Sequence, residues 1–470
     1  MDFETARFVL SKSGEDCLKE LTARYPSIAA PQELSVIEWL RKHARLNQAQ
    51  SSAILEVAKA RQKAAETNKF SRAAEMFFTR EALEQASGEE IAAYRSRRFA
   101  RVFEANTAIA DLCCGIGGDT TALSRHFSVT GVDLDQARLL FAAANAAVYG
   151  NAERFAGLHE DVKECKINSY LGAFFDPGRR TKDGRRINNP EHYLPPLSTI
   201  HSWLPHLKGL AVKLSPGIDY EKLKDLDCEI EIISQDGEVK EALLWFGTLK
   251  EVGGETGGKV ARHRATLLTS KKATAPARDE DERAPGENDR AEVDSNSAQS
   301  ENQRVGVDAS SPPGDDDKRI ITFSDAEGME PLAVAPLARY LHEPDGAIIR
   351  AGLVELVGAR FNALKIDQDI AYLTGATPAK APLMRSFEVL AAMPFSLKKL
   401  KAELQALACT SVVVKKRGSP IAPEELLKAL ALKNAHKKAK HDAEPQTELT
   451  VFLTHLNGIH SAIITREYKA

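Results

Sequence analysis

Short apolar runs alternate with helical stretches between residues 107 and 214, and this alternation limits the possible folds more than any other feature. The runs TAIADLCC, SVTGVD and GLAVKL have the pattern of buried strands, whereas DQARLLFAAANAAVYG carries apolar residues at helical spacing. We also expect a helix over PPLSTIHSWLPHL, before the strand GLAVKL. Strands separated by helices pair in parallel, because each crossover returns the chain to the same end of the sheet. The sequence therefore predicts a doubly wound α/β sheet, extended by a hairpin that turns at Asp236 and Gly237.

Composition divides the chain into five segments. The first hundred residues repeat apolar side chains at helical spacing, and the last segment holds 14 basic against 8 acidic residues. The third segment has 13 acidic and 7 basic residues and almost no large apolar side chains, and we expect it to be disordered. The predicted segments are a helical region (1–100), the α/β sheet domain (101–270), an acidic linker (271–318), a connecting α/β segment (319–382) and a small α/β domain (383–470).

Several classes of protein are disfavoured by composition. No apolar run approaches the roughly 20 residues that span a bilayer, so we expect no membrane partner. The six cysteines form no CxxC pair, which argues against a disulfide framework and against a metal site. The opening MDFETARFVLSKSGED lacks the apolar run of a signal peptide, so we expect a cytoplasmic protein, and the oligomeric state stays undetermined.

A glycine-rich turn joins the first predicted strand to the helix after it. Gly115, Gly117 and Gly118 occupy this turn, where the missing side chains let a ligand approach the backbone amides at a helix N-terminus. About 20 residues later the second strand ends at Asp133, where an acid can accept both hydroxyls of a ribose. The third strand leads to Asp161 at the same edge of the sheet. A dinucleotide fold that uses NAD is the alternative, but the turn lacks the third spaced glycine of that fingerprint.

These elements resemble class I S-adenosylmethionine (SAM)-dependent methyltransferases over residues 70 to 250. The stretch DLCCGIGGDTTALSRHFSVTGVDLDQARLLFAAANAAVYG is similar to the core of trimethylguanosine synthase and related RNA methyltransferases. The resemblance implies a Rossmann-like class I methyltransferase sheet with SAM as cofactor. It also implies a set of cofactor-binding residues: Asp111, Gly115 and Gly117 at the methionine part, Asp133 at the ribose, Asp161 at the adenine, and Phe78 with Thr79 against the cofactor. Independently of the resemblance, we expect Thr79 to be the N-cap of the helix that begins in MFFTREALEQAS.

The fourth strand ends in FFDPGRR, which places Asp176 at the carboxyl edge of the sheet. This segment resembles the (N/D)PP(Y/F/W) motif of methyltransferases that act on exocyclic amines, which implies catalytic roles for Asp176, Pro177 and Arg179. Gly178 replaces the second proline of that motif, and Arg179 replaces its aromatic residue. An arginine can stack on a base or bind phosphate, so Arg179 and Arg180 are also candidate RNA-binding residues, with a solvated loop as the alternative.

Other charged residues have less specific patterns. Lys213 ends the fifth strand, where it either lines the pocket or extends into solvent. We expect Glu241 and Trp245 of the hairpin to serve structure, because a tryptophan in a strand usually belongs to the core. The segment LHEPDGAIIRAGLV places three charges around an apolar helix start, and N-capping with internal pairing explains them: Glu343, Asp345 and Arg350.

The last segment resembles the THUMP-like domain that is attached to such methyltransferases, and the resemblance implies contact with RNA. Lys415, Lys416 and Arg417 end a strand before a glycine turn and are candidate phosphate contacts, as is the basic helix around Arg95, Arg97 and Arg98. A basic module that is only structural is the alternative, because positive charge alone is weak support for nucleic-acid binding.

The sequence therefore predicts a SAM-dependent methyltransferase that methylates a nucleobase nitrogen in RNA, either tRNA or rRNA. One alternative is an enzyme for a small anionic metabolite, which the arginine-rich loop would clamp. The other is a catalytically inactive RNA-binding protein that keeps the SAM fold, because the DPGRR segment departs from the amine-methylating motif.

Overall fold

The computed structural model describes residues 1–179, 187, 189–251, 262–269, 319–325, 329–379, 382–430 and 448–469. The chain forms two compact units. The first comprises Met1–Ile230 with Glu241–Val252, and the second comprises Glu231–Lys240 with Gly253–Ala470. The acidic stretch 271–318 that the sequence analysis expects to be disordered lies outside the described residues.

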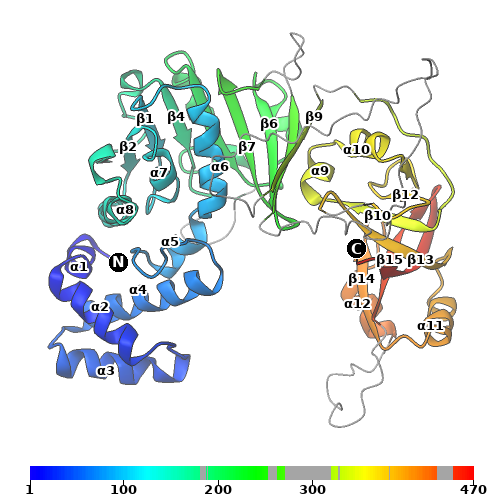
Figure 1. The fold of residues 1–470 in the computed structure, drawn as a ribbon, viewed down its shortest axis with the longest axis horizontal. Helices are drawn as coiled ribbons and strands as arrows, with labels where there is room; N and C mark the ends of the chain where they lie inside the picture. Colours follow the sequence, from blue (N-terminus) through cyan, green and yellow to red (C-terminus); the bar gives the residue numbers. More distant parts are fainter. Residues whose placement is uncertain are drawn as a thin grey trace, which may run out of the picture. The chain divides into compact units, whose positions relative to one another are not determined.

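The first unit begins with helices whose ends are set by side-chain caps. Asp2, Ser11 and Asn47 each accept a hydrogen bond from a backbone N–H in the first turn of the helix that follows. One apolar face of each of the first four helices packs into a shared core (Figure 1). The helices of this region are α1 (Phe3–Val9), α2 (Lys12–Arg24), α3 (Glu33–His43), α4 (Gln48–Glu66), α5 (Arg80–Gln85) and α6 (Glu89–Ala100).

A sheet with helical crossovers follows, in the strand order β3-β2-β1-β4-β5-β7 within this unit. The first five strands of this order are parallel, and β7 runs antiparallel to β5. The strands and helices are β1 (Ala108–Leu112), α7 (Gly118–Leu123), β2 (Ser128–Asp133), α8 (Gln136–Val148), β3 (Phe155–His159), β4 (Gly172–Phe175), β5 (Gly209–Leu214), β6 (Glu229–Gln235) and β7 (Glu238–Gly247). The predicted doubly wound α/β sheet is confirmed.

Two local predictions have different outcomes. The turn between β6 and β7 falls at Asp236 and Gly237, as predicted, and both residues have positive φ (51° and 81°), as a tight hairpin turn requires. The helix predicted over PPLSTIHSWLPHL is a short 3₁₀ helix, Leu197–Ser202. The prolines that flank it explain its length, because a proline ring blocks the preceding helical turn and removes an N–H donor.

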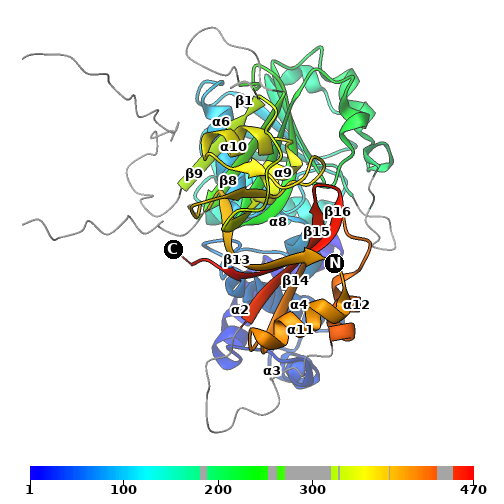
Figure 2. The same cartoon turned by 90° about the vertical axis from the view of Figure 1, so that its right-hand side faces the viewer.

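The second unit contains a paired β8 (His263–Thr269) and β9 (Arg319–Ser324), and a seven-stranded sheet in the order β11-β12-β10-β13-β16-β15-β14. Leucines of α11 and α12 pack into one core with side chains of β15 and β16, so both helices cover one face of this sheet (Figure 2). Its elements are β10 (Tyr340–Pro344), α9 (Gly346–Arg350), α10 (Val354–Arg360), β11 (Leu364–Lys365), β12 (Leu373–Gly375), β13 (Met384–Pro394), α11 (Leu397–Ala406), β14 (Ser411–Lys416), α12 (Pro423–Leu430), β15 (Glu448–Leu456) and β16 (Ile459–Glu467).

Helix α6 is basic in sequence, but its arginines do not form a solvent-exposed surface. Arg95 and Arg98 are 1% and 2% exposed, so the expectation that they contact a phosphate backbone is wrong. The Arg98 guanidinium lies 4.1 Å from the centroid of the Trp245 ring, and it donates hydrogen bonds to Glu229 (2.6 Å) and to the carbonyl of Leu249 (2.7 Å). The predicted phosphate contacts of Arg95 and Arg98 fail because the acids that pair with these arginines are buried. Helical spacing in the sequence does not distinguish a solvated arginine from one that faces a buried acid.

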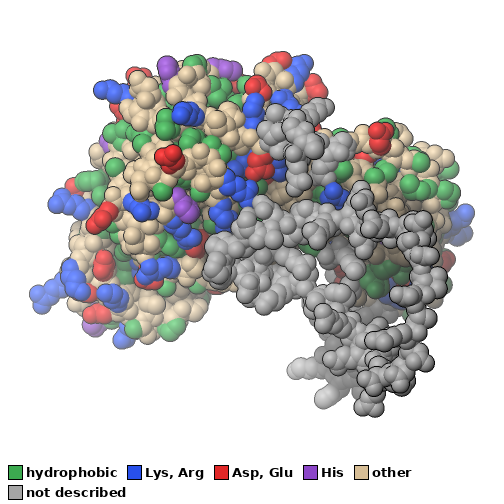
Figure 3. Space-filling view, turned by 45° about the horizontal axis from the view of Figure 1, so that its top comes forward, with side chains coloured by type: hydrophobic (Ala, Val, Ile, Leu, Met, Phe, Trp, Pro, Cys, Tyr) green, Lys and Arg blue, Asp and Glu red, His purple; other side chains and the backbone are tan. Residues whose placement is uncertain are grey.

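No helix among the described residues is long and apolar enough to cross a membrane. The face of the protein drawn in Figure 3 carries basic side chains scattered among acidic ones rather than a field of one sign.

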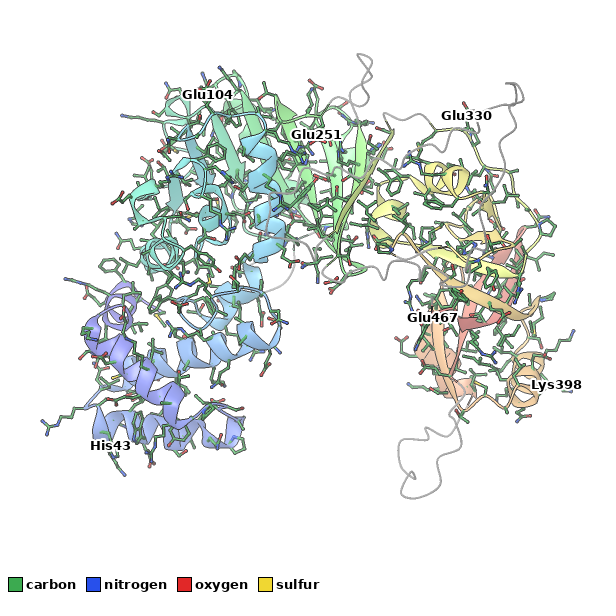
Figure 4. The ribbon with its side chains drawn as sticks, in the orientation of Figure 1. His43, Glu104, Glu251, Glu330, Lys398 and Glu467 are labelled. Carbon is green, nitrogen blue, oxygen red and sulfur yellow. The ribbon has the colours of Figure 1, made fainter. Side chains whose placement is uncertain are left out.

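We predict that Arg98→Ala lowers the free energy of unfolding by about 3–5 kcal/mol, because Glu229 is fully buried and would lose its charge partner. Arg101→Ala is the matched control, since Arg101 makes an exposed pair with Glu251 (3.1 Å; Glu251 is labelled in Figure 4) and should cost less than about 1 kcal/mol. Urea unfolding of both variants measures the difference. Equal losses would contradict the assignment of Arg98 to the core.

Candidate active site

The turn between β1 and α7 has the backbone shape that its glycines allow. Gly115 and Gly117 have φ values of 56° and 78°, in the left-handed region that favours glycine. A side chain at Gly117 would meet the Cα of Ala142 at 3.1 Å, so this glycine is required for contact with α8. At Gly115 an added Cβ would meet no atom of the described residues within 4 Å, so these residues leave open space beside this part of the turn. A ligand can therefore approach the backbone at Gly115.

Asp133, at the end of β2, is bonded to the same turn. Its carboxylate accepts hydrogen bonds from the backbone N–H of Gly115 and of Asp135, both at 2.9 Å. The side chain is only partly buried, and its remaining lone pairs are free for a ligand hydroxyl. Asp161 lies just beyond β3, the neighbouring strand, where it accepts from Lys163 N–H (3.0 Å) and pairs with the Lys163 ammonium (3.3 Å). Both acids are thus at the edge of the sheet where the sequence analysis placed them.

Asn145 of α8 holds the segment before α5 against the glycine-rich turn. Its side-chain oxygen accepts from Phe77 N–H (2.7 Å), and its amide donates to the carbonyls of Phe77 and Ile116, both at 2.9 Å. The next residue, Phe78, is fully buried and stacks on Phe70, and Thr79 caps α5 as predicted. The structure therefore brings the Phe78–Thr79 segment close to the turn, with Phe78 packed in the helical core.

Asp111, the residue before the last of β1, lies inside the protein rather than on the open side of the turn. It is 1% exposed and accepts a hydrogen bond from the Thr120 hydroxyl. Burial is the main cause that raises the pKa of Asp111 well above its usual range, and the negative charge of Asp119 acts in the same direction. This position favours a neutral carboxyl that supports the turn from within.

Arg95 balances the acids around this carboxyl. Its guanidinium donates to Asp119 (Nε to Oδ1, 2.9 Å), which is in the first turn of α7, and pairs with Glu241 of β7. The same guanidinium lies 4.9 Å from the centroid of the Phe174 ring on β4. Glu241 therefore serves structure, as predicted, and one buried arginine joins α6 to α7, β4 and β7.

Asp176 occupies the end of β4, directly beside β1. Its N–H donates to the carbonyl of Leu112 (3.1 Å), and its Oδ2 accepts from the Lys213 ammonium at 2.7 Å. Lys213 is 4% exposed and also donates to the Ser87 hydroxyl (3.0 Å), so it lies in the site and does not extend into solvent. The Asp176 side chain is still 23% exposed, which leaves part of the carboxylate accessible.

One of the two departures from the amine-methylating motif, the glycine in place of the second proline, has a structural explanation. Gly178 N–H donates to the carbonyl of Leu194 (2.9 Å), and Leu194 N–H donates back to Gly178 (3.0 Å). A proline at this position would have no N–H for the first bond. Pro177 is buried, and Arg179 is half-buried with its carbonyl accepting from Ile187 N–H (2.9 Å). Arg180 and the further arginines of this loop, Arg185 and Arg186, lie outside the described residues.

The candidate RNA contacts of the second unit differ in accessibility. The Lys415 ammonium pairs with Glu343, and the Arg417 guanidinium lies 5.3 Å from the centroid of the Tyr372 ring. Of the three basic residues at the end of β14, Lys416 is exposed, whereas Lys415 and Arg417 are half-buried. Asp345 caps α9 by accepting from Ala347 N–H (2.8 Å), as predicted.

The described part of the first unit thus combines an open glycine turn, an acid suited to a ribose, and an accessible carboxylate held by a buried lysine. This arrangement can bind a nucleoside-containing cofactor and position a hydrogen-bond donor at Asp176.

No three His, Cys, Asp or Glu side chains gather as a metal site within the described ranges. Sequence reasoning missed Ser87, Asn145 and Asp119, because nothing in their local pattern shows which distant residues they meet.

We predict that Asn145→Ala lowers the free energy of unfolding by about 1–3 kcal/mol, because a buried N–H and two carbonyls lose their partner. Gln136→Ala, on the exposed face of the same helix, is the control and should change stability by less than about 0.5 kcal/mol. Thermal unfolding monitored by circular dichroism compares the two. A loss no larger than that of the control would show that the 76–79 segment does not depend on Asn145.

Comparison with known proteins agrees with this geometry. Residues 106–242 match the family model "RNA cap guanine-N2 methyltransferase", and residues 384–467 match the model "THUMP domain-like". An uncharacterized SAM-dependent methyltransferase of Mycobacterium tuberculosis is 30% identical over 371 residues, which cover 77% of this chain and 83% of the relative, with the same values in strains CDC 1551 / Oshkosh and H37Rv.

A crystal structure assigned as a methyltransferase from Porphyromonas gingivalis W83 has a TM-score of 0.61 at 18% identity. It covers 94% of this chain and 100% of that chain, and it supports the fold. The predicted class I fold, the THUMP-like domain and the SAM cofactor are therefore confirmed. The chain belongs to the family of SAM-dependent methyltransferases.

Proposed function

We propose that this methyltransferase transfers the methyl group of SAM to a nucleobase nitrogen in RNA, with tRNA and rRNA as the substrate classes. The observation that carries the proposal is Asp176, an accessible carboxylate at the end of β4 whose Oδ2 is held by a buried lysine. The match of residues 106–242 to the guanine-N2 methyltransferase model supports a base amine as acceptor, and the THUMP domain-like match supports RNA.

The residues of the turn fit the cofactor. SAM supplies an electrophilic methyl group, and the open space beside Gly115 together with the free lone pairs of Asp133 suits its amino-acid part and its ribose. Asp161 and Thr79 complete the proposed cofactor site, whereas the predicted contact of the Phe78 side chain is wrong, because Phe78 is fully buried in the helical core. Asp111 supports the cofactor site indirectly, because it accepts a hydrogen bond from Thr120 and so positions the first turn of α7.

The proposed role of Asp176 is to accept a hydrogen bond from the acceptor amine. Lys213 holds Oδ2, which orients the carboxylate and leaves Oδ1 for the substrate. The amine is then fixed with its nitrogen lone pair directed at the methyl group, and such positioning can supply a large part of the rate enhancement. Pro177 keeps the backbone after Asp176 in one conformation, and Arg179, with Arg180, offers a cation for the phosphates of the substrate.

RNA contact outside the catalytic unit is the remaining part of the proposal. Lys416 is exposed at the end of β14, and Lys415 and Arg417 flank it. Lys398 on α11 is a further exposed lysine, labelled in Figure 4, that extends away from the sheet. Lys416 and Lys398 are suited to phosphate contacts that carry no sequence information, whereas Lys415 already pairs with Glu343.

Asp133→Asn should weaken SAM binding by about 1–3 kcal/mol, because an amide replaces the charged acceptor for the ribose hydroxyls. The asparagine keeps one oxygen for the Gly115 N–H but loses the acceptor for the Asp135 N–H, so the fold of the variant is checked alongside its affinity. Isothermal titration calorimetry with SAM measures the change, and circular dichroism checks the fold. Unchanged affinity in the folded variant would remove Asp133 from the cofactor site.

Asp176→Ala should reduce methyl transfer to in vitro transcribed tRNA and rRNA by roughly 100-fold or more, with SAM affinity within a few-fold of wild type. Asp176→Asn should retain more activity than Asp176→Ala, because it keeps a side-chain oxygen that can accept from an amine. Asp225→Ala, at an exposed acid of the same unit, is the control. Transfer of radiolabelled methyl from SAM to RNA measures all three, and near wild-type activity in Asp176→Ala would refute the mechanism.

A further inference from the structure

The hydrogen-bonded bridge between Gly178 and Leu194 brings a second chain segment to the acceptor side of Asp176. The two residues exchange both backbone hydrogen bonds in an antiparallel pair, at 2.9 and 3.0 Å. Residues directly opposite each other in such a pair carry their side chains on the same face. The side chain of Leu194 therefore lies on the face where Gly178 has none.

Alternation of exposure shows that Asp176 belongs to this face as well. Along the loop, Phe175 and Pro177 are buried, whereas Asp176 and Gly178 are partly or fully exposed. In the opposite segment Tyr193 is 1% exposed and Leu194 is 62% exposed. Asp176, Gly178 and Leu194 are thus the accessible members of the paired segments.

The space between the carboxylate and the leucine is not filled by a side chain of Gly178. Among the described residues, a Cβ built at Gly178 would meet one atom within 4 Å, the carbonyl oxygen of Leu194 at 3.3 Å. A planar group could lie over the Gly178 backbone, with a polar edge at Asp176 and one face against Leu194. A large apolar side chain exposed beside a polar anchor is the usual composition of a small-molecule or base pocket.

We propose that Leu194 is the residue that contacts the face of the acceptor base, in place of the aromatic residue that the DPGR segment lacks. The inference rests on the proposed transfer to a nucleobase. Leu194 supplies apolar contact that is removed from water when the base binds, whereas Asp176 supplies the hydrogen bond that orients the amine. Apolar contact with the face of a base is similar for every base. Leu194 therefore strengthens binding of the acceptor, and the hydrogen bonds to the edge of the base determine which base is accepted.

Steady-state methylation of in vitro transcribed tRNA and rRNA tests the proposal. Leu194→Ala should raise the KM for RNA roughly tenfold, because most of the apolar contact is lost, while kcat stays within about threefold. Leu194→Trp should keep KM at or below the wild-type value, because an indole ring offers a larger face for stacking. Leu171→Ala is the matched control, since Leu171 is also exposed (44%) but precedes β4 at the opposite end of the strand.

The controls separate this inference from the proposed function. Leu194 is exposed, so Leu194→Ala should unfold at the wild-type temperature and bind SAM with wild-type affinity. An unchanged KM in Leu194→Ala, a change in kcat alone, or an equal effect of Leu171→Ala would overturn the role of Leu194 while the proposed function stands. A wild-type protein that methylates neither RNA would overturn the proposed function and the inference together.

Discussion

One buried arginine connects the elements on which the catalytic site depends. Arg95 leaves α6 and reaches Asp119 in the first turn of α7 and Glu241 on β7, and its guanidinium lies over the ring of Phe174 on β4. Isolated charges are costly in a protein interior, so this arginine and its two acids stabilise the fold only as a set. Because α7 begins at the glycine-rich turn and β4 ends at Asp176, the same set fixes both halves of the site.

The acceptor side of the site uses a backbone pair where related motifs use a proline. Gly178 forms its two hydrogen bonds with Leu194, which is possible because glycine keeps its N–H. The departure from the amine-methylating motif therefore has a structural reason and is compatible with an active enzyme. Lys213 adds a second constraint, since its ammonium joins Asp176 to Ser87 while the Asp176 side chain stays 23% exposed.

Local patterns in the sequence were sufficient to predict the sheet, the glycine turn, Asp133, and the caps at Thr79 and Asp345. Each of these depends on periodicity or on spacing along a strand and helix, which short-range rules describe well. Arg95 and Arg98 could not be placed in this way, because their partners are 24 to 151 residues away in the chain. The role of Asn145 depends on a similar long-range contact with Phe77.

The most direct test of the account is mass spectrometry of nucleosides from the RNA of cells that lack this protein. The account predicts that one nucleoside with a methyl group on a base nitrogen disappears, that the wild-type chain restores it, and that the Asp176→Ala chain does not. An unchanged nucleoside profile, or the loss of a methyl group from a ribose oxygen or a ring carbon, would contradict the assignment of this site to nucleobase-nitrogen methylation.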